Sequence, residues 1–351
     1  MIIKFKAVYA ICLIGLAVAV FGLNGPTALA QETSDVASKL AAAVDLYSEL
    51  EFNKGLAITD ELLKRDNLTA KDSIAIFEVK SLITYAMGQA YQRKAFEFLE
   101  KISQIGPCVI NFPRDIWPAE LRDQWYKITN AQNMLVCPDE SRDPEIRTIA
   151  IMEFDNYSIG KYKEEMGELS KGLADFFQHD FSLISSLKVV ERDKIDFVLK
   201  ELELTEKGKV DAETAARVGK LLGAQLMVFG SITQIDDKNT RMIVRVVKVE
   251  TSEILASVDK EGKPDYVGME KALVGELAEK LDIILPKETK VMLEEGGTES
   301  MDAVKLYARG LDYMDKYDYK NAYEYFKMAY EKDDSFIEAK RKMDIYRPLV
   351  G

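Results

Sequence analysis

The feature that most constrains the fold is a long stretch, Arg147 to Ile284, in which strand-like and helix-like patterns alternate. Short apolar runs indicate strands, and apolar residues spaced by three or four indicate amphipathic helices. The expected elements are strand 147–154, helix 164–184, strand 188–191, helices 193–204 and 212–222, strands 226–235, 241–250 and 253–260, and helix 266–285. The order β-α-β-α-α-β-β-β-α predicts an α/β domain with a mixed sheet over residues 145–286.

Local signals support this order. Gly223 follows the third expected helix of the domain and suits the left-handed conformation that ends many helices. In the second of the last three strands, Met242 and Val244 alternate with Arg241 and Arg245. Because successive side chains of a strand point to opposite faces, the methionine and valine are expected to face a core and the arginines to face solvent.

Residues 31–138 show a helical pattern that repeats. Four helices are expected, over 35–50, 53–64, 70–88 and 92–105. Thr69 followed by Asp72 is a capping-box signature for the third of them. Helices joined by short turns form antiparallel pairs, which are the unit of a helical repeat. The segment resembles tetratricopeptide repeats, with Ala95 at the small position of the motif.

Residues 300–347 carry a clearer version of this repeat, after an acidic linker at 287–299. With Ala322 at the small position, the other motif positions are filled by Leu306, Gly310, Tyr313, Tyr319, Phe326 and Ala329. The helix from Phe336 to Tyr346 is then a solvating helix that caps the repeat, or the first half of another one. All-α segments resembling tetratricopeptide repeats are therefore expected on both sides of the α/β domain.

Tyr307, Leu311 and Met314 form a stripe along the first helix of the C-terminal repeat. The stripe resembles the ligand-facing side of tetratricopeptide helices, and aromatic residues are common at interfaces. One interpretation is a groove that binds a protein partner. The other is packing against the solvating helix, and the sequence favours neither.

The first 30 residues have the pattern of a signal peptide. Lys4 and Lys6 precede an apolar segment, Ala7 to Leu23, and residues 28–30 (Ala-Leu-Ala) form a cleavage site. A single-pass anchor is the alternative, but the apolar run is marginal for spanning a bilayer. Cleavage would leave Gln31 rather than a cysteine at the new N-terminus, so no lipid anchor is expected there. The chain is predicted to be periplasmic, with at most peripheral association with the outer membrane.

Two cysteines, Cys108 and Cys137, remain after the expected cleavage. An even number of cysteines in an oxidising compartment favours one disulfide bond. Such a bond would close a loop of about 30 residues around a helical stretch that begins near Pro118. Two buried free thiols are the alternative.

The composition argues against nucleic acid, catalysis and cofactors. A formal net charge of −12 repels phosphate backbones and anionic headgroups. The only histidine, His179, lies in the polar register of an expected helix, so no nucleophile–base pair is indicated. No phosphate-binding glycine motif occurs, and the cysteines and histidine are too few and scattered for zinc. Because the carboxylates mostly occupy helix caps and polar faces, we expect no enzyme activity, no metal and no cofactor.

Motifs of the central stretch resemble the CsgG-type domain of curli secretion proteins. They are GELSKGLA (167–174), VVER (189–192), GKVD (208–211), GKLLGA (219–224), GSI (230–232) and VETSEI (249–254). They occur in the order found in the family, between Arg147 and Ile284. The resemblance implies a periplasmic α/β unit, in a family whose members mostly bind, assemble or export rather than catalyse.

A pore is not expected from this resemblance. The curli secretion channel inserts two amphipathic hairpins into the membrane, and each needs about 20 residues or more. Here only the polar segment Asp155 to Lys163 separates the first strand from the first helix of the domain. The predicted function is therefore a non-catalytic docking or assembly component of secretion or outer-membrane-associated machinery. It would bind protein partners through its repeats and associate with itself through the central domain. A subunit of an outer-membrane secretion channel is the alternative.

Overall fold

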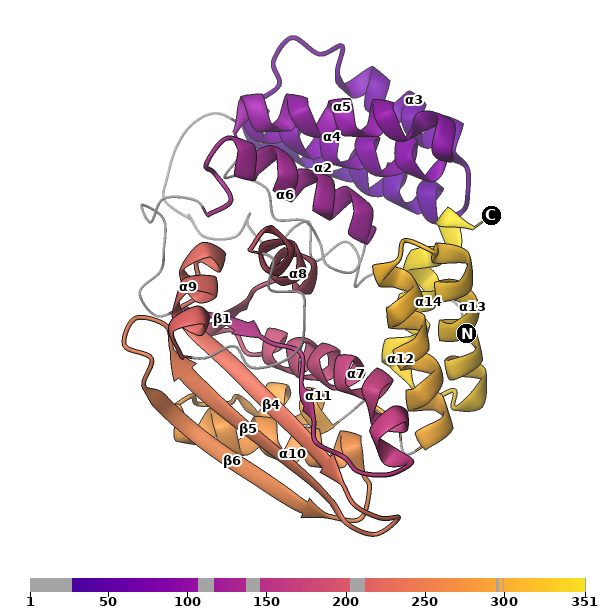
Figure 1. Cartoon of the computed structure of the whole chain (residues 1–351). Coiled ribbons are helices and arrows are strands. Elements are labelled where there is room, and N and C mark those ends of the chain that lie inside the picture. Colours follow the sequence, from indigo (N-terminus) through magenta and orange to yellow (C-terminus); the bar gives the residue numbers. More distant parts are fainter. Residues whose placement is uncertain are drawn as a thin grey trace. The chain divides into compact units, whose positions relative to one another are not determined.

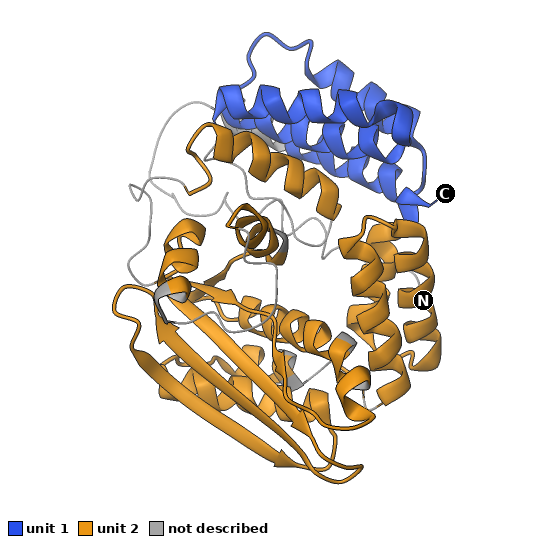
Figure 2. Ribbon diagram, in the orientation of Figure 1, with its two compact units in different colours: residues 1–113, 347–351 blue, residues 114–346 orange. Residues whose placement is uncertain are grey.

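The computed structural model describes residues 27–106, 117–136, 146–202, 212–294, 297–298 and 300–350. The chain forms two compact units (Figure 2), one of residues 1–113 with 347–351 and the other of residues 114–346. Within the described residues, no helix is long and apolar enough to cross a membrane. Most of the predicted signal peptide lies outside the described residues, and so do Cys108 and Cys137 with their predicted disulfide.

The first unit is all-α. Its helices are α2 (Thr27–Ser48), α3 (Phe52–Leu62), α4 (Ala70–Ala86) and α5 (Gln89–Ile105), and each packs on the next along the chain. The predicted capping box is confirmed, because Thr69 Oγ1 accepts the backbone N–H of Asp72 at 3.0 Å and the Asp72 carboxylate accepts that of Thr69 at 3.1 Å. Gly55 lets α3 approach α4 closely, since a Cβ there would lie 2.9 Å from Ile83 Cδ1. The assignment of these helices to tetratricopeptide repeats stays a prediction.

The second unit is built around a mixed sheet with the strand order β3-β1-β4-β5-β6. The strands are β1 (Arg147–Ile151), β3 (Leu187–Val189), β4 (Leu226–Gln234), β5 (Thr240–Lys248) and β6 (Ile254–Gly262). β1 runs parallel to both β3 and β4, whereas β4, β5 and β6 pair antiparallel. The predicted mixed sheet is therefore confirmed.

A short strand that the sequence analysis missed, β2 (Asp155–Asn156), runs parallel to β4. The following residues continue this pairing: the backbone N–H of Tyr157 donates to the carbonyl of Ile232 at 2.9 Å, and that of Ile159 to the carbonyl of Gln234 at 3.2 Å. The segment expected to be only a polar connection thus extends the pairing along β4 beyond the end of β1. The alternation of Tyr157 and Ile159 with polar residues was the signal for it.

Two helices, α7 (Tyr162–Ser182) and α10 (Tyr266–Lys280), contact each other and cover one face of the sheet (Figure 1). Met242 and Val244 of β5 are fully buried on this side, as their alternation predicts. Two further helices, α8 (Arg192–Glu201) and α9 (Ala212–Leu222), follow β3 in the chain. Gly223 ends α9 with φ of 68°, the left-handed conformation predicted for it.

Two predicted domain boundaries differ from the structure. The helix α6 (Ala119–Ala131) belongs to the second unit rather than to the helical domain predicted at 31–138. It packs on α8, where the rings of Tyr126 and Phe197 are 6.1 Å apart. The predicted linker at 287–299 contains a helix, α11 (Lys287–Glu294). Periodicity identifies an apolar helix face but does not show which neighbour covers it.

The C-terminal helices are α12 (Met301–Asp315), α13 (Tyr319–Lys332) and α14 (Ile337–Tyr346), and each packs on the next. They are not a separate domain, because α12 also packs along α7 within the second unit. A final 3-10 helix, η2 (Arg347–Leu349), belongs to the first unit, where Arg347 donates to the carbonyl of Ser48 at 2.7 Å. A helix pair is present where the sequence predicts one, and its classification as a tetratricopeptide repeat stays a prediction.

Candidate functional site

The stripe predicted as a partner groove is buried in this structure. Tyr307, Leu311 and Met314 are 1%, 0% and 3% exposed. The Tyr307 ring stacks on Phe176 of α7 with centroids 5.5 Å apart, and its hydroxyl donates to Asp175 Oδ2 at 2.6 Å. The prediction of an open groove is wrong for these residues, because α12 uses this face to pack on α7. The alternative was packing against the solvating helix, and the Tyr307 ring does lie 5.0 Å from that of Phe336, where this helix was expected to begin. The contact with α7 is one that the sequence did not indicate.

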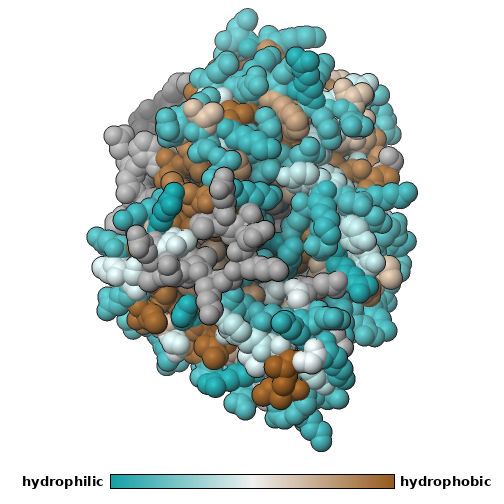
Figure 3. Space-filling model, in the orientation of Figure 1, coloured by the Kyte–Doolittle hydropathy of each residue, from teal (hydrophilic) through white to brown (hydrophobic). Residues whose placement is uncertain are grey.

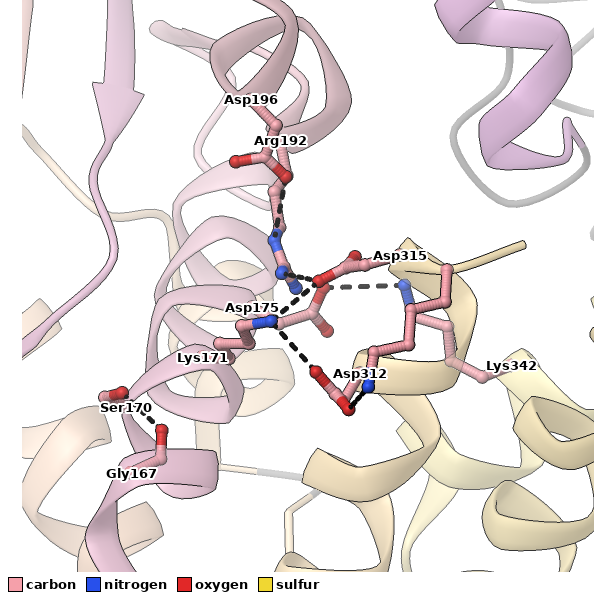
Figure 4. Close-up of polar contacts among 10 residues, drawn as sticks. Gly167, Ser170, Lys171, Asp175, Arg192, Asp196, Asp312, Asp315 and Lys342 are labelled. Atoms are coloured by element: carbon pink, nitrogen blue, oxygen red, sulfur yellow. Dashed lines mark hydrogen bonds and ion pairs between the residues drawn. The ribbon is translucent and has the colours of Figure 1, made fainter. Parts of the chain in front are cut away.

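Charged side chains surround this contact and join α7, α8, α12 and α14 (Figure 4). Lys171 of α7 lies 3.2 Å from Asp312 and 3.1 Å from Asp315, which are both on α12. Arg192, the first residue of α8, forms an ion pair at 2.6 Å with the same Asp315. Asp315 therefore links α12 to cations on two other helices.

This network is largely shielded from solvent, since the side chains of Arg192 and Asp315 are 12% and 20% exposed. Burial by itself would lower the pKa of Arg192, but the carboxylates of Asp315 and Asp196 raise it above its usual value. The pKa of Lys171 is raised in the same way: burial lowers it, and the nearby carboxylates, Asp315 foremost, together outweigh that effect. Both cations stay charged and paired, which suits a structural junction rather than acid–base catalysis.

A second buried cluster lies between α7, α10 and α14. Asp180 of α7 and Glu270 of α10 are 3% and 1% exposed, and Asp180 Oδ2 and Glu270 Oε1 have no hydrogen-bond partner among the described residues. Lys271 Nζ lies 3.6 Å from Asp180 Oδ2, and Glu338 of α14 accepts the backbone N–H of Gly297 at 3.1 Å. Burial raises the pKa of both Asp180 and Glu270, and the charge of Asp180 raises that of Glu270 further.

The sequence analysis did not identify Glu270, although a signal existed. Glu270, Leu273 and Leu277 share one face of α10 at helical spacing, so the carboxylate sits on the apolar side. His179, beside Asp180 on α7, lies 3.1 Å from the guanidinium of Arg341 on α14, measured from Nδ1. Across the residues with a described position, no three Cys, His, Asp or Glu side chains are placed to hold a metal ion.

The described residues leave the other face of the sheet largely open. Arg241, Ile243 and Arg245 are exposed and alternate with buried residues along β5, as the sequence predicts. The helix α9 reaches only one end of this face, near Met227. We call this surface the open sheet face. Its residues, placed by strand register, are Asp155, Tyr157, Ile159, Phe229, Ser231, Thr233, Arg241, Ile243, Arg245, Ser257, Asp259 and Glu261.

The open sheet face mixes apolar, aromatic and charged side chains. Ile243 is 37% exposed near its middle, and Tyr157 and Ile159, in the residues that follow β2, are 52% and 56% exposed. The guanidinium of Arg245 lies 5.4 Å from the centre of the Phe229 ring. Figure 3 shows hydrophobic side chains separated by polar ones over the strands β4, β5 and β6. Surfaces of this composition are typical of contacts between proteins.

Together these observations define a mixed α/β domain with helices on one face, an open sheet face on the other, and charged residues used in packing. Residues 132–244 match the family described as curli production assembly/transport component CsgG. This part of the chain is therefore similar to the CsgG family. The match includes β1 to β4 and ends within β5, so it supports the resemblance seen in the sequence for the first part of the predicted domain.

No curated protein matches the chain. Solved structures with some similarity include TolB from Acinetobacter baumannii, with 14% identity and a TM-score of 0.27, over 39% of this chain and 28% of that chain. The LpoB C-terminal domain from Escherichia coli matches with 12% identity and a TM-score of 0.28, over 38% and 92% of the two chains. Lipoprotein GNA1162 from Neisseria meningitidis matches with 13% identity and a TM-score of 0.29, over 39% and 98%. At these TM-scores we draw nothing further from the similarities.

Proposed function

We propose that this chain is a non-catalytic docking component of a secretion or assembly machinery of the cell envelope, and that its open sheet face binds a protein partner. The CsgG-type match over residues 132–244 supports the first part, because the family description names curli production, assembly and transport. The observation that carries the second part is that, within the described part of the chain, one face of the sheet lacks a helical layer and presents apolar and aromatic side chains.

The chemistry of the open sheet face fits a protein partner. Ile243 and Phe229 supply apolar area, and the guanidinium of Arg245 can bind a carboxylate in two-pronged geometry. The backbone beneath is fixed by pairing with neighbouring strands on both sides of β5, from Thr240 to Lys248. A fixed backbone loses little conformational entropy on binding, so more of the contact energy appears as affinity.

Two further features belong to the proposal. The signal-peptide pattern of residues 1–30 supports a periplasmic location. The helices α2 to α5 are a second region for protein partners, as their repeat-like sequence pattern suggests. Because Tyr307, Leu311 and Met314 are buried, the C-terminal helices are assigned to packing on α7 instead.

The test is a double substitution on the open sheet face, Ile243→Asp with Arg245→Glu, in the tagged full-length chain. Partners are captured from the cell envelope by crosslinked affinity purification and quantified by mass spectrometry. We expect at least about a tenfold loss of the captured partner, because an unpaired carboxylate buried at a contact costs more than about 1.4 kcal/mol.

The matched control makes the same chemical changes elsewhere: Met328→Asp with Lys327→Glu on α13, where Met328 is 45% exposed. This variant should capture the partner at the wild-type level. Light scattering of the purified chain shows whether the partner is a second copy. In that case the molar mass in solution would fall in the Ile243→Asp, Arg245→Glu variant and not in the control. Equal capture by both double variants would show that the open sheet face is not the docking surface.

A further inference from the structure

Asp180 and Glu270 take no part in the proposed docking, yet burying their two carboxyl groups costs folding free energy. They bring two carboxyl groups from neighbouring helices into a site shielded from water, with one carboxylate oxygen of each lacking a hydrogen-bond partner. Two ionised carboxylates in such a site repel each other and lose their hydration. Binding one proton removes the repulsion and supplies the missing donor.

We propose that Asp180 and Glu270 share a proton, and that this proton fastens α14 and the segment at Gly297 to α7 and α10 as a pH-sensitive latch. The inference is independent of the proposed docking function. With the proton on Glu270, its O–H donates to Asp180, so that the two carboxyl groups satisfy each other. The remaining negative charge of the pair is opposed by Lys271, whose Nζ is 3.6 Å from Asp180 Oδ2.

Each part of the cluster is tied to a different element of the second unit. Lys271 of α10 also donates to the carbonyl of Leu293 in α11 at 2.5 Å. Glu338 of α14 accepts the backbone N–H of Gly297 through both of its oxygens, at 3.1 and 3.2 Å. The charge on the Asp180–Glu270 pair therefore acts on three packed helices and on the segment before α12.

The charges around Asp180 and Glu270 determine how loss of their shared proton affects α14. Glu338 adds a third carboxylate, and its charge raises the pKa of both Asp180 and Glu270. The neighbouring cations of α14 are engaged elsewhere, since Arg341 lies 3.1 Å from His179 and Lys342 lies 3.4 Å from Asp175. Full ionisation would set the charge of Glu338 against two carboxylates opposed by Lys271 alone, and movement of α14 away from them would relieve this repulsion.

The direction of the pH dependence follows from the raised pKa values. Asp180 has a usual pKa of 3.8, and burial raises it to about 6 in the folded chain; burial also raises the pKa of Glu270, well above 4.5. The open form therefore releases protons that the closed form still holds. The latch has its full strength below about pH 4 and weakens as pH rises through the folded pKa values, by about tenfold per pH unit for each proton.

The experiment compares wild type with Glu270→Gln, which keeps the shape and a hydrogen-bond donor but cannot ionise. Hydrogen exchange of residues 297–298 and 337–346 is followed by mass spectrometry between pH 5 and pH 9, corrected for intrinsic rates. In wild type the protection of these amides should fall with rising pH, about tenfold per unit where Glu270 still holds its proton. In Glu270→Gln the fall should end near pH 6, where Asp180 loses its own proton, and protection at pH 8 should exceed that of wild type.

The matched control is Glu279→Gln, an exposed position on the same helix, which should follow wild type at every pH. Asp180→Asn is a second, independent variant. It leaves Glu270 without a charged neighbour on α7, so the fall in protection should move to lower pH. Two results would contradict a proton shared by Asp180 and Glu270. One is the same pH dependence of amide protection in Glu270→Gln as in wild type, and the other is a fall in protection at an unchanged pH in Asp180→Asn.

Discussion

Gly310 shows how the absence of a side chain sets the distance between two helices. A Cβ at this position on α12 would lie 2.5 Å from the ring of Phe326 on α13, which is fully buried. Gly275 on α10 differs, because a Cβ there would meet no atom within 4 Å. Both glycines lie within helices, but only Gly275 has space for a side chain.

Gly310→Ala should therefore destabilise the chain by about 1–3 kcal/mol, because the new methyl group forces the helices apart. Gly275→Ala should stabilise it by up to about 1 kcal/mol, because alanine is the better helix former and has open space. Urea unfolding of both variants measures the difference. Equal effects at the two positions would contradict the close contact with Phe326.

Local chemistry at single residues was the most predictable part of the structure. The capping box of Thr69 and Asp72 and the left-handed Gly223 depend on a few neighbouring residues, so the sequence sufficed. The burial of Glu270 was harder to predict, because glutamate is normally exposed even though this one lies on the apolar face of α10. Its neighbours on α7 and α14 come from distant parts of the chain.

At the scale of elements, the junction of α7 with α12 depends on Asp315. This carboxylate accepts from Arg192 at 2.6 Å and from Lys171 at 3.1 Å, in a site where Arg192 is 12% exposed. Removing one member of a buried ion pair leaves the other charge without compensation, which costs more than the pair itself contributes.

Asp315→Asn should lower the free energy of unfolding by about 3–5 kcal/mol, the cost of a broken buried pair. The matched control is Asp302→Asn on the same helix, where the carboxylate is 68% exposed and pairs with Lys332 at 3.1 Å. That change should cost no more than about 1 kcal/mol. Thermal and urea unfolding check both values, and a cost for Asp315→Asn as small as the control's would rule out a stabilising junction.

The order and type of the elements could be predicted from the periodicity of the sequence. Which elements pack against each other could not. The alternation in β5 identified its buried side, and the mixed sheet followed from the pattern of strands and helices. The stripe of Tyr307, Leu311 and Met314 was identified as a contact face, but its covering element, α7, lies more than a hundred residues away in the chain. A helical period cannot distinguish a face that binds a partner from one that packs within the molecule.

At the scale of the whole molecule, the second unit uses the C-terminal helices and the sheet in different ways. The helices α12 and α14 are fixed to α7 by aromatic stacking and ion pairs, so the buried face of α12 is not an open groove. The sheet has helices on one face and the open sheet face on the other. If the chain docks, this surface is where a rigid, partly apolar contact can form.

The most direct test of this account is site-specific photocrosslinking in cells. A photoreactive phenylalanine analogue replaces Ile243 on the open sheet face or Met328 on α13, both of them partly exposed. The account predicts a discrete crosslinked product from position 243 and none from position 328. No product from position 243, or the same products from both positions, would contradict docking through the open sheet face.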